Sequence, residues 1–166
     1  MEQPIGHIGL YILTESIAKD SAVKEVAISN GKQHIQFSDP IEIPDKIKEF
    51  EDSAGGQLMV AVNSFEWNQD IFKRVGIRKP MLSVYLVSVI QTARAQLRNR
   101  TLNLPISENN YKTRSVAEVA KILKAKGYRI EGEQSYTDSV LHAQYLWSLY
   151  DALLFNEDRQ NLTIQS

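Results

Sequence analysis

The sequence predicts an α/β protein with a mixed five-stranded sheet, made of a three-strand antiparallel meander plus two parallel strands and flanked by helices. Three observations lead to this fold class. The pair Asn30-Gly31 joins two short segments in the manner of a β-hairpin. Residues 58–62 form a continuous apolar run directly after two glycines, which is typical of a buried central strand. Helical patterns then alternate with strand patterns, and this favours crossover connections between parallel strands.

The meander occupies the start of the chain. Residues 5–13 contain the apolar run Ile-Gly-Leu-Tyr-Ile-Leu, which suits a buried strand. Residues 23–29 alternate between apolar and charged side chains, and residues 34–37 form the return strand after the Asn-Gly turn. We therefore expect three consecutive antiparallel strands.

A helix and a central strand come next. Ile43, Ile47, Phe50 and Ala54 recur at spacings of four, three and four residues, which predicts an amphipathic helix that the following two glycines end. The apolar run at 58–62 predicts a strand parallel to the first. The polar residues 63–79 predict a long loop.

The second half of the chain predicts three helices and one more strand. Pro80 suits the first turn of a helix over residues 80–99, which is apolar on nearly all sides at its start and is expected to be a buried central helix. Residues 101–106 read as the fifth strand. Ser115 and Glu118 form a capping box for a basic helix over residues 115–126. Thr137 is placed to cap a last helix to about residue 155.

One domain is expected over residues 1–155, followed by a polar C-terminal tail at 156–166. Cysteine is absent, which excludes disulfide scaffolds and thiolate chemistry. The N-terminus lacks the features of a signal peptide, and no apolar run is long enough to span a bilayer. A cytoplasmic protein without membrane contact is the expectation.

Charge is distributed very unevenly along the chain. Residues 73–129 hold thirteen Lys and Arg against two Glu, a net charge of +11, whereas residues 1–72 carry −7 and residues 130–166 carry −5. A basic segment of this kind is suited to an anionic partner, most commonly nucleic acid. The alternative is that folding interleaves the three blocks into a neutral, solvated surface. Candidate phosphate contacts are Arg94, Arg98, Arg100, Lys112, Arg114, Lys121 and Lys124.

With this element order, the layout matches the ribonuclease H-like one, and the second half of the chain resembles the RuvC group of Holliday junction nucleases. Four features carry the resemblance: a long helix of small and aliphatic residues, a short strand, a basic helix, and a last helix opened by an acid. In this chain these are Met81 to Leu97, Leu102 to Ile106, Ser115 to Lys126 after a polar turn with Lys112, and the helix at Asp138. The resemblance implies phosphodiester hydrolysis by two metal ions held by about four carboxylates, and it suggests a homodimer.

The chain departs from that family at the carboxylates. Tyr11 stands two residues after the glycine of the first strand, where the family has its first acid, and Asn63 stands where the second is expected. Asp138 remains, but His142 follows it in place of another acid. A phenol and a neutral amide cannot neutralise two divalent cations. Glu15 and Glu66 lie nearby in sequence as possible substitutes.

Three hypotheses follow. The leading one is a catalytically degenerate RuvC-like module for nucleic-acid binding or protein interaction, which contacts phosphates through its basic third. For this module no cofactor is expected, and the nucleic acid expected as its partner is DNA before RNA. The second is an active Mg²⁺- or Mn²⁺-dependent endonuclease with a rearranged site of Glu15, Glu66 and Asp138. The third is an accessory or inhibitory factor that binds an acidic protein. Asp138 and His142, four residues apart on one helix face, are a candidate metal pair or, alternatively, a helix-cap interaction.

Overall fold

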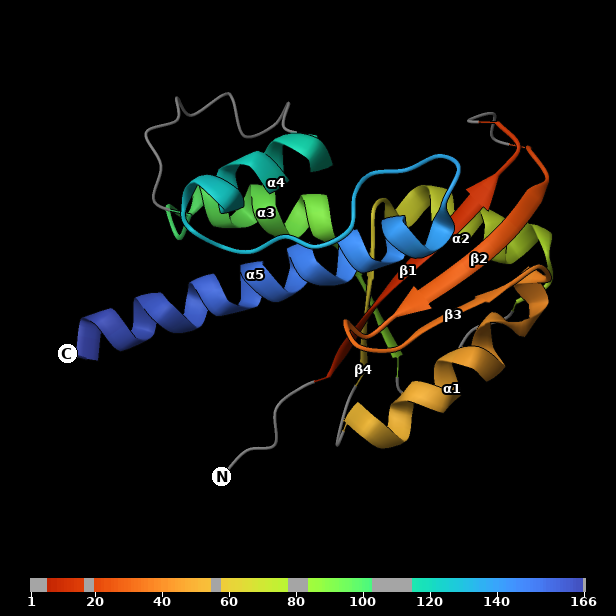
Figure 1. Ribbon diagram of the computed structural model, residues 1–166, viewed down its shortest axis with the longest axis horizontal. Helices are drawn as coiled ribbons and strands as arrows, with labels where there is room; N and C mark the ends of the chain where they lie inside the picture. Colours follow the sequence, from red (N-terminus) through yellow and green to blue (C-terminus); the bar gives the residue numbers. More distant parts are fainter. Residues whose placement is uncertain (1–5, 17–19, 55–57, 78–83, 103–114, 166) are drawn as a thin grey trace.

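A computed structural model of the chain describes residues 6–16, 20–54, 58–77, 84–102 and 115–165 (Figure 1). Its centre is a five-stranded sheet with the order β3-β2-β1-β4-β5. β1 pairs antiparallel with β2, and β2 pairs antiparallel with β3. β4 is parallel to both β1 and β5. The predicted fold class, a mixed sheet of three antiparallel and two parallel strands with flanking helices, is confirmed. The strands are β1 (His7–Thr14), β2 (Val23–Ser29), β3 (His34–Phe37), β4 (Leu58–Val62) and β5 (Val84–Ser88).

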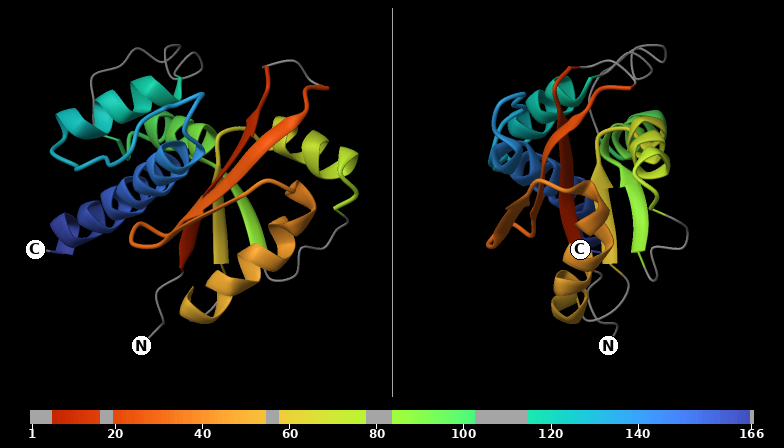
Figure 2. Two further views of the ribbon diagram at one scale, coloured as in Figure 1. Left: turned by 45° about the vertical axis from the view of Figure 1, so that its right-hand side comes forward. Right: turned by 90° about the vertical axis from the view of Figure 1, so that its right-hand side faces the viewer.

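Helices cover both faces of the sheet (Figure 2). Alternate residues of each strand point to opposite faces. Ile8 and Val60 therefore pack with α1 and α2 on one face, whereas Tyr11 and Ala61 pack with α3, α4 and α5 on the other. The sheet is thus the middle of three layers. The helices are η1 (Pro40–Glu42), α1 (Ile43–Ala54), α2 (Phe65–Arg74), α3 (Val89–Arg98), α4 (Val116–Ala125) and α5 (Ser139–Gln165).

The loop predicted over residues 63–79 is wrong, because most of it forms α2. Ile71 and Phe72 are buried on one face of this helix, and Phe65 and Trp67 are half-buried against the same core. Gly76 ends the helix with φ +83°. The apolar spacing and the terminal glycine were both present in the sequence, but polar residues between them obscured the pattern.

The helix predicted over residues 80–99 is also wrong in its first part. Val84–Ser88 is a strand, β5, and the helix α3 begins only at Val89. A continuous apolar run fits a buried strand and a buried helix equally well by periodicity. Ser88 marks the true start of the helix, since its hydroxyl accepts a hydrogen bond from the Gln91 amide at 3.3 Å.

The position of the fifth strand shifts with this correction. Thr101 and Leu102, which were expected to begin it, lie outside any strand, and the rest of 101–106 lies outside the described residues. The last helix also differs from the prediction, because α5 continues for 27 residues to Gln165 instead of ending near residue 155. None of the described helices is both long enough and apolar enough to cross a bilayer.

Candidate functional site

The seam between β1 and α5 contains Tyr11, Asp138 and His142, three of the positions at which the RuvC resemblance expects metal-binding acids, whereas the fourth, Asn63, directly follows β4. The two elements run antiparallel, because successive β1 residues meet earlier positions of α5: His7 stacks on Trp147, and Tyr11 stacks on His142. Gly9 lies between these pairs. A Cβ atom on Gly9 would come within 2.2 Å of the Ala143 carbonyl oxygen, so only glycine allows this approach.

Tyr11 and His142 form a face-to-face pair. Their ring centroids are 3.6 Å apart and their planes differ by 9°. His142 is 1% exposed. Tyr136 and Tyr145 meet the same imidazole edge-on, each with its centroid 6.3 Å away. The position expected for the first carboxylate is therefore part of an aromatic cluster, and Tyr136, which sequence reasoning had not singled out, is its exposed member.

Neither member of the stacked pair carries charge at neutral pH. Burial, with a smaller contribution from the nearby Tyr136 phenol, raises the pKa of Tyr11 to about 12. Burial lowers the pKa of His142, although a hydrogen bond to the Ser135 backbone partly opposes this. The Nδ1 atom of His142 lies 2.8 Å from the Ser135 carbonyl oxygen. Its buried Nε2 atom has no hydrogen-bond partner among the described residues.

Asp138 caps α5. One carboxylate oxygen accepts hydrogen bonds from the backbone amides of Val140 and Leu141 at 3.0 and 3.1 Å. Thr137, which the sequence favoured as the cap, precedes it. Within the part of the chain that the structure describes, no hydrogen bond or ion pair joins the side chains of Asp138 and His142, so the structure favours the cap interaction over a paired site for Asp138.

Glu15 and Glu66 are both exposed and lie in different parts of the fold. Glu15 follows the end of β1, where its backbone amide bonds to the Ala22 carbonyl at 2.9 Å. Glu66 lies in the first turn of α2, which covers the opposite face of the sheet from α5. Across the described ranges, no three His, Asp or Glu side chains are grouped in a way that would hold a metal ion.

The other end of the seam is a polar cluster around His7. Its Nε2 atom lies 3.2 Å from the Trp147 carbonyl oxygen and 3.7 Å from a carboxylate oxygen of Asp151. The indole of Trp147 donates in return to the His7 carbonyl at 3.1 Å. Burial lowers the pKa of His7 to about 4 and raises the pKa of Asp151.

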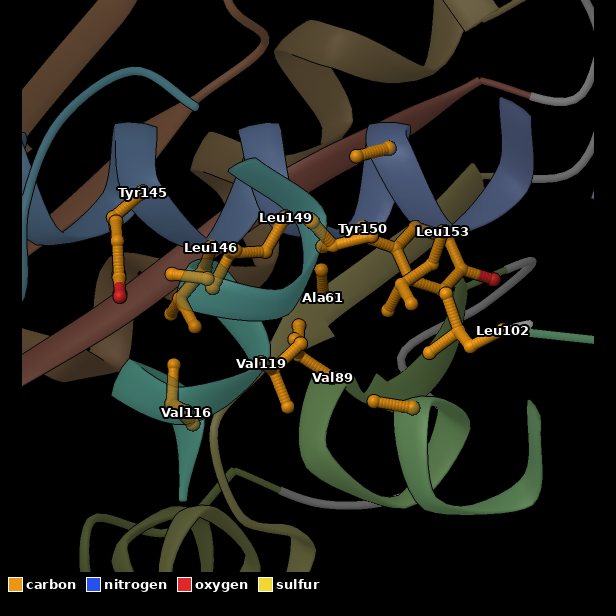
Figure 3. Packing of buried hydrophobic residues seen from close by; sticks show 14 residues of the cluster. Ala61, Val89, Leu102, Val116, Val119, Tyr145, Leu146, Leu149, Tyr150 and Leu153 are labelled. Atoms are coloured by element: carbon orange, nitrogen blue, oxygen red, sulfur yellow. The ribbon is translucent and has the colours of Figure 1, made fainter. Parts of the chain in front are cut away.

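The candidate phosphate contacts gather on α3 and α4. These two helices pack against each other and against α5 through a shared core, in which Val89, Leu102 and Val119 face Leu149 and Leu153 (Figure 3). This packing fixes both helices on one face of the sheet. The polar sides of α3 and α4 are thereby left to solvent.

Four of the predicted cations are exposed on these helices or in the turn that ends α3, and we call them the α3–α4 basic surface: Arg98, Arg100, Lys121 and Lys124. Arg94 is only half-buried and its Nε atom is enclosed. Lys112 and Arg114 lie outside the described residues. The stretch from Val89 to Leu102 contains no acid, and α4 contains only Glu118. Within the described residues, these four cations of the basic segment are exposed to solvent after folding.

Comparison with known proteins adds no family. No protein-family model matches the chain, and no curated protein matches it in sequence.

Proposed function

We propose that this chain is a ribonuclease H-like domain of the RuvC type that lacks a working two-metal centre and binds the phosphate backbone of nucleic acid through the α3–α4 basic surface. The sheet order and its mixture of antiparallel and parallel pairs support the fold-level part of this proposal. The functional part depends on the site, since a fold alone does not define an activity.

The proposal is carried by the exposure of four cations on α3, on α4 and in the turn that ends α3, with the two helices packed against each other: Arg98, Arg100, Lys121 and Lys124. Lys and Arg that neutralise phosphates release condensed counterions, which gives affinity without base specificity. Thr101 to Ser115 connects the two helices and carries Lys112 and Arg114, so the same part of the sequence supplies further cations.

The loss of catalysis is supported by the seam between β1 and α5. The two side chains at family acid positions, Tyr11 and His142, are uncharged and stacked on each other. The remaining acid, Asp138, uses its carboxylate to cap a helix. Two divalent cations need several charged oxygen ligands at short range, and this arrangement provides a tyrosine, an imidazole and a cap in their place.

The test is fluorescence-anisotropy binding to labelled four-way-junction, duplex and single-stranded DNA, each at low and at near-physiological salt. We expect binding that weakens steeply with salt, and a preference for the junction would add to the RuvC resemblance. The double variant Lys121→Ala/Lys124→Ala should reduce the slope of log K against log salt by about 1.8, because two phosphate contacts are lost.

A matched control is Lys48→Ala/Lys73→Ala, which removes the same number of exposed charges from α1 and α2 on the opposite face of the sheet. This variant should bind as the unmodified chain does. Equal weakening by both variants would show that only net charge matters, which would contradict a localised surface.

Two other outcomes are informative. Cleavage of labelled DNA on addition of Mg²⁺ or Mn²⁺, lost on Asp138→Asn, would favour the endonuclease alternative. Binding of all three DNA forms no tighter than by a neutral control protein would refute the nucleic-acid proposal. The basic surface would then be free for an acidic protein partner.

A further inference from the structure

Three helices of this chain end in the same hydrogen-bonded motif, and only one of them ends without glycine. This motif is the Schellman motif, in which the residue after the C-cap has a left-handed backbone. The N–H groups of that residue and of the next residue donate hydrogen bonds to carbonyl groups in the last turn of the helix. At the end of α2, the Gly76 amide bonds to Lys73 at 3.2 Å and the Ile77 amide to Phe72 at 2.8 Å. At the end of α4, the corresponding bonds are Gly127 to Lys124 at 3.0 Å and Tyr128 to Leu123 at 3.1 Å.

The end of α3 has the same bonds but an arginine at the left-handed position. The Arg100 amide bonds to the Leu97 carbonyl at 3.2 Å, and the Thr101 amide bonds to the Gln96 carbonyl at 2.8 Å. Arg100 has φ 60°, where the two glycines have +83° and +94°. It is the one non-glycine residue with positive φ in the described part of the chain.

A left-handed backbone is unfavourable for an L-residue with a Cβ atom and is nearly free for glycine. Lack of space does not explain why glycine occupies the other two helix ends, because a Cβ atom on Gly76 or Gly127 would meet no described atom within 4 Å. Glycine thus occupies these two helix ends because its backbone adopts the left-handed conformation at almost no cost. Arginine at the third end carries a conformational cost that nothing in the helix geometry requires.

The Arg100 side chain does not recover this cost through any contact with the described residues. The residue is exposed, and no hydrogen bond or ion pair joins its guanidinium to the residues that the structure describes. Meanwhile the turn itself is tightly held, because Leu102, two residues later, is 1% exposed and lies beside Leu153 of α5 (Figure 3). The guanidinium therefore projects to solvent from a fixed backbone.

We infer that Arg100 is the phosphate anchor of the α3–α4 basic surface: it occupies a position that suits glycine because its guanidinium binds a nucleic-acid phosphate. This inference rests on the proposed function and adds to it the residue around which binding is organised. A guanidinium matches phosphate with paired N–H donors. Because the backbone of Arg100 is already fixed, less conformational entropy is lost when the residue binds phosphate. Strained backbone positions are commonly found at functional sites.

Arg100→Gly separates stability from binding. Releasing the left-handed strain should raise the melting temperature by about 2–4 °C in a chain of this size. The same change should weaken binding to labelled duplex DNA about tenfold at low salt and reduce the salt slope by about 0.9. Arg100→Lys keeps both the backbone strain and the charge. Its melting temperature and its slope of log K against log salt should therefore stay unchanged. Its affinity for DNA should fall less than that of Arg100→Gly.

The matched control is Gly76→Arg, which places an arginine in the same motif on the opposite face of the sheet. It should lower the melting temperature by a similar amount and leave DNA binding unchanged. Tighter DNA binding by this variant would show that any added charge suffices and would overturn the anchor role.

The failures can be told apart. If the unmodified chain binds DNA and Arg100→Gly binds equally well, or if Arg100→Gly is no more stable, the anchor role is refuted while the proposed function stands. If the unmodified chain binds no nucleic acid at low salt, both are refuted.

Discussion

The imidazole of His142 lies flat on the phenol of Tyr11, with ring centroids 3.6 Å apart, at the point where α5 crosses β1. Contacts of this kind between stacked rings contribute through dispersion and through the area they remove from water. The pair joins the first strand to the last helix, which are far apart in the sequence. It is therefore a structural contact of the fold, at positions where the RuvC resemblance would place acids.

The stacked pair predicts a specific difference between two variants of Tyr11. Tyr11→Ala removes the ring that covers His142 and should lower the free energy of unfolding by about 2–3 kcal/mol. Tyr11→Phe retains the ring and loses only the hydroxyl, so its change should be below about 1 kcal/mol. Urea denaturation followed by circular dichroism measures both. Equal losses in the two variants would mean that the hydroxyl, and not the stacking, stabilises the seam.

Two buried histidines make stability depend on pH. Burial lowers the pKa of His7 from the ordinary 6.5 to about 4, and it also lowers the pKa of His142. Both side chains therefore bind protons more readily in the unfolded chain, so stability is full above about pH 6.5 and decreases as the pH falls toward 4. For His7 alone the loss amounts to roughly 3 kcal/mol.

Asp151, which faces His7, acts in the opposite direction. Its raised pKa means that the folded chain takes up this proton more readily, which partly offsets the loss as the pH falls toward the ordinary Asp value. Denaturant midpoints between pH 7 and pH 4.5 should still decline. His7→Gln should flatten that decline, because glutamine does not titrate. A histidine ring-proton titration that places the pKa of His7 near 6.5 would contradict the expectation.

The five-stranded sheet could be predicted because its signals are local. The Asn30-Gly31 turn and the apolar run of β4 each identify their own element without reference to distant residues. The position of β5 could not be obtained in the same way. Residues 84–90 are apolar except for Ser88, and strand and helix burial produce the same pattern in such a run. The pair Ser88 and Gln91 did contain a capping signal that divides the run into β5 and α3.

The candidate site was only partly predictable. The exposure of Arg98 and Lys121 follows from helical periodicity, so the composition of the basic surface could be read from the sequence. The left-handed backbone of Arg100 could not, because arginine at that position contradicts the residue preference of the motif. The stacking of Tyr11 on His142 also required the structure, since sequence order does not determine which residues of β1 meet α5.

The close approach of α5 to β1 makes Gly9 a sensitive position. Gly9→Ala would bring its new Cβ atom within 2.2 Å of the Ala143 carbonyl oxygen and 2.6 Å of the Trp147 amide nitrogen. Both are backbone atoms, so the helix would have to move, and we expect a loss of about 3 kcal/mol or failure to fold. Gly127→Ala is the comparison, because its Cβ would meet no described atom within 4 Å and only backbone strain of about 1 kcal/mol remains. Thermal melts of the two variants should rank them in that order.

Substitutions at Asp138 can tell a helix-capping role from a metal-binding role. Its carboxylate accepts amide hydrogen bonds from Val140 and Leu141, and an N-cap of this kind contributes about 1 kcal/mol. Asp138→Ala should therefore lower the free energy of unfolding by about that amount, whereas Asp138→Asn should cost only a few tenths, since asparagine caps equally well. Neither change touches the α3–α4 basic surface, so both variants should bind labelled DNA as the unmodified chain does.

A metal-binding role would remove the difference between the two variants in any Mg²⁺-dependent property. Asparagine keeps the cap but removes the charge that a divalent cation requires. If Asp138 were a metal ligand, Asp138→Asn would lose Mg²⁺-dependent stabilisation or cleavage as fully as Asp138→Ala. The decisive measurement is thus the melting temperature of the unmodified chain and of both variants, first without Mg²⁺ and then at Mg²⁺ concentrations raised in 10-fold steps. We expect no Mg²⁺-dependent shift in any of the three, with stability that follows the capping ability of residue 138 alone.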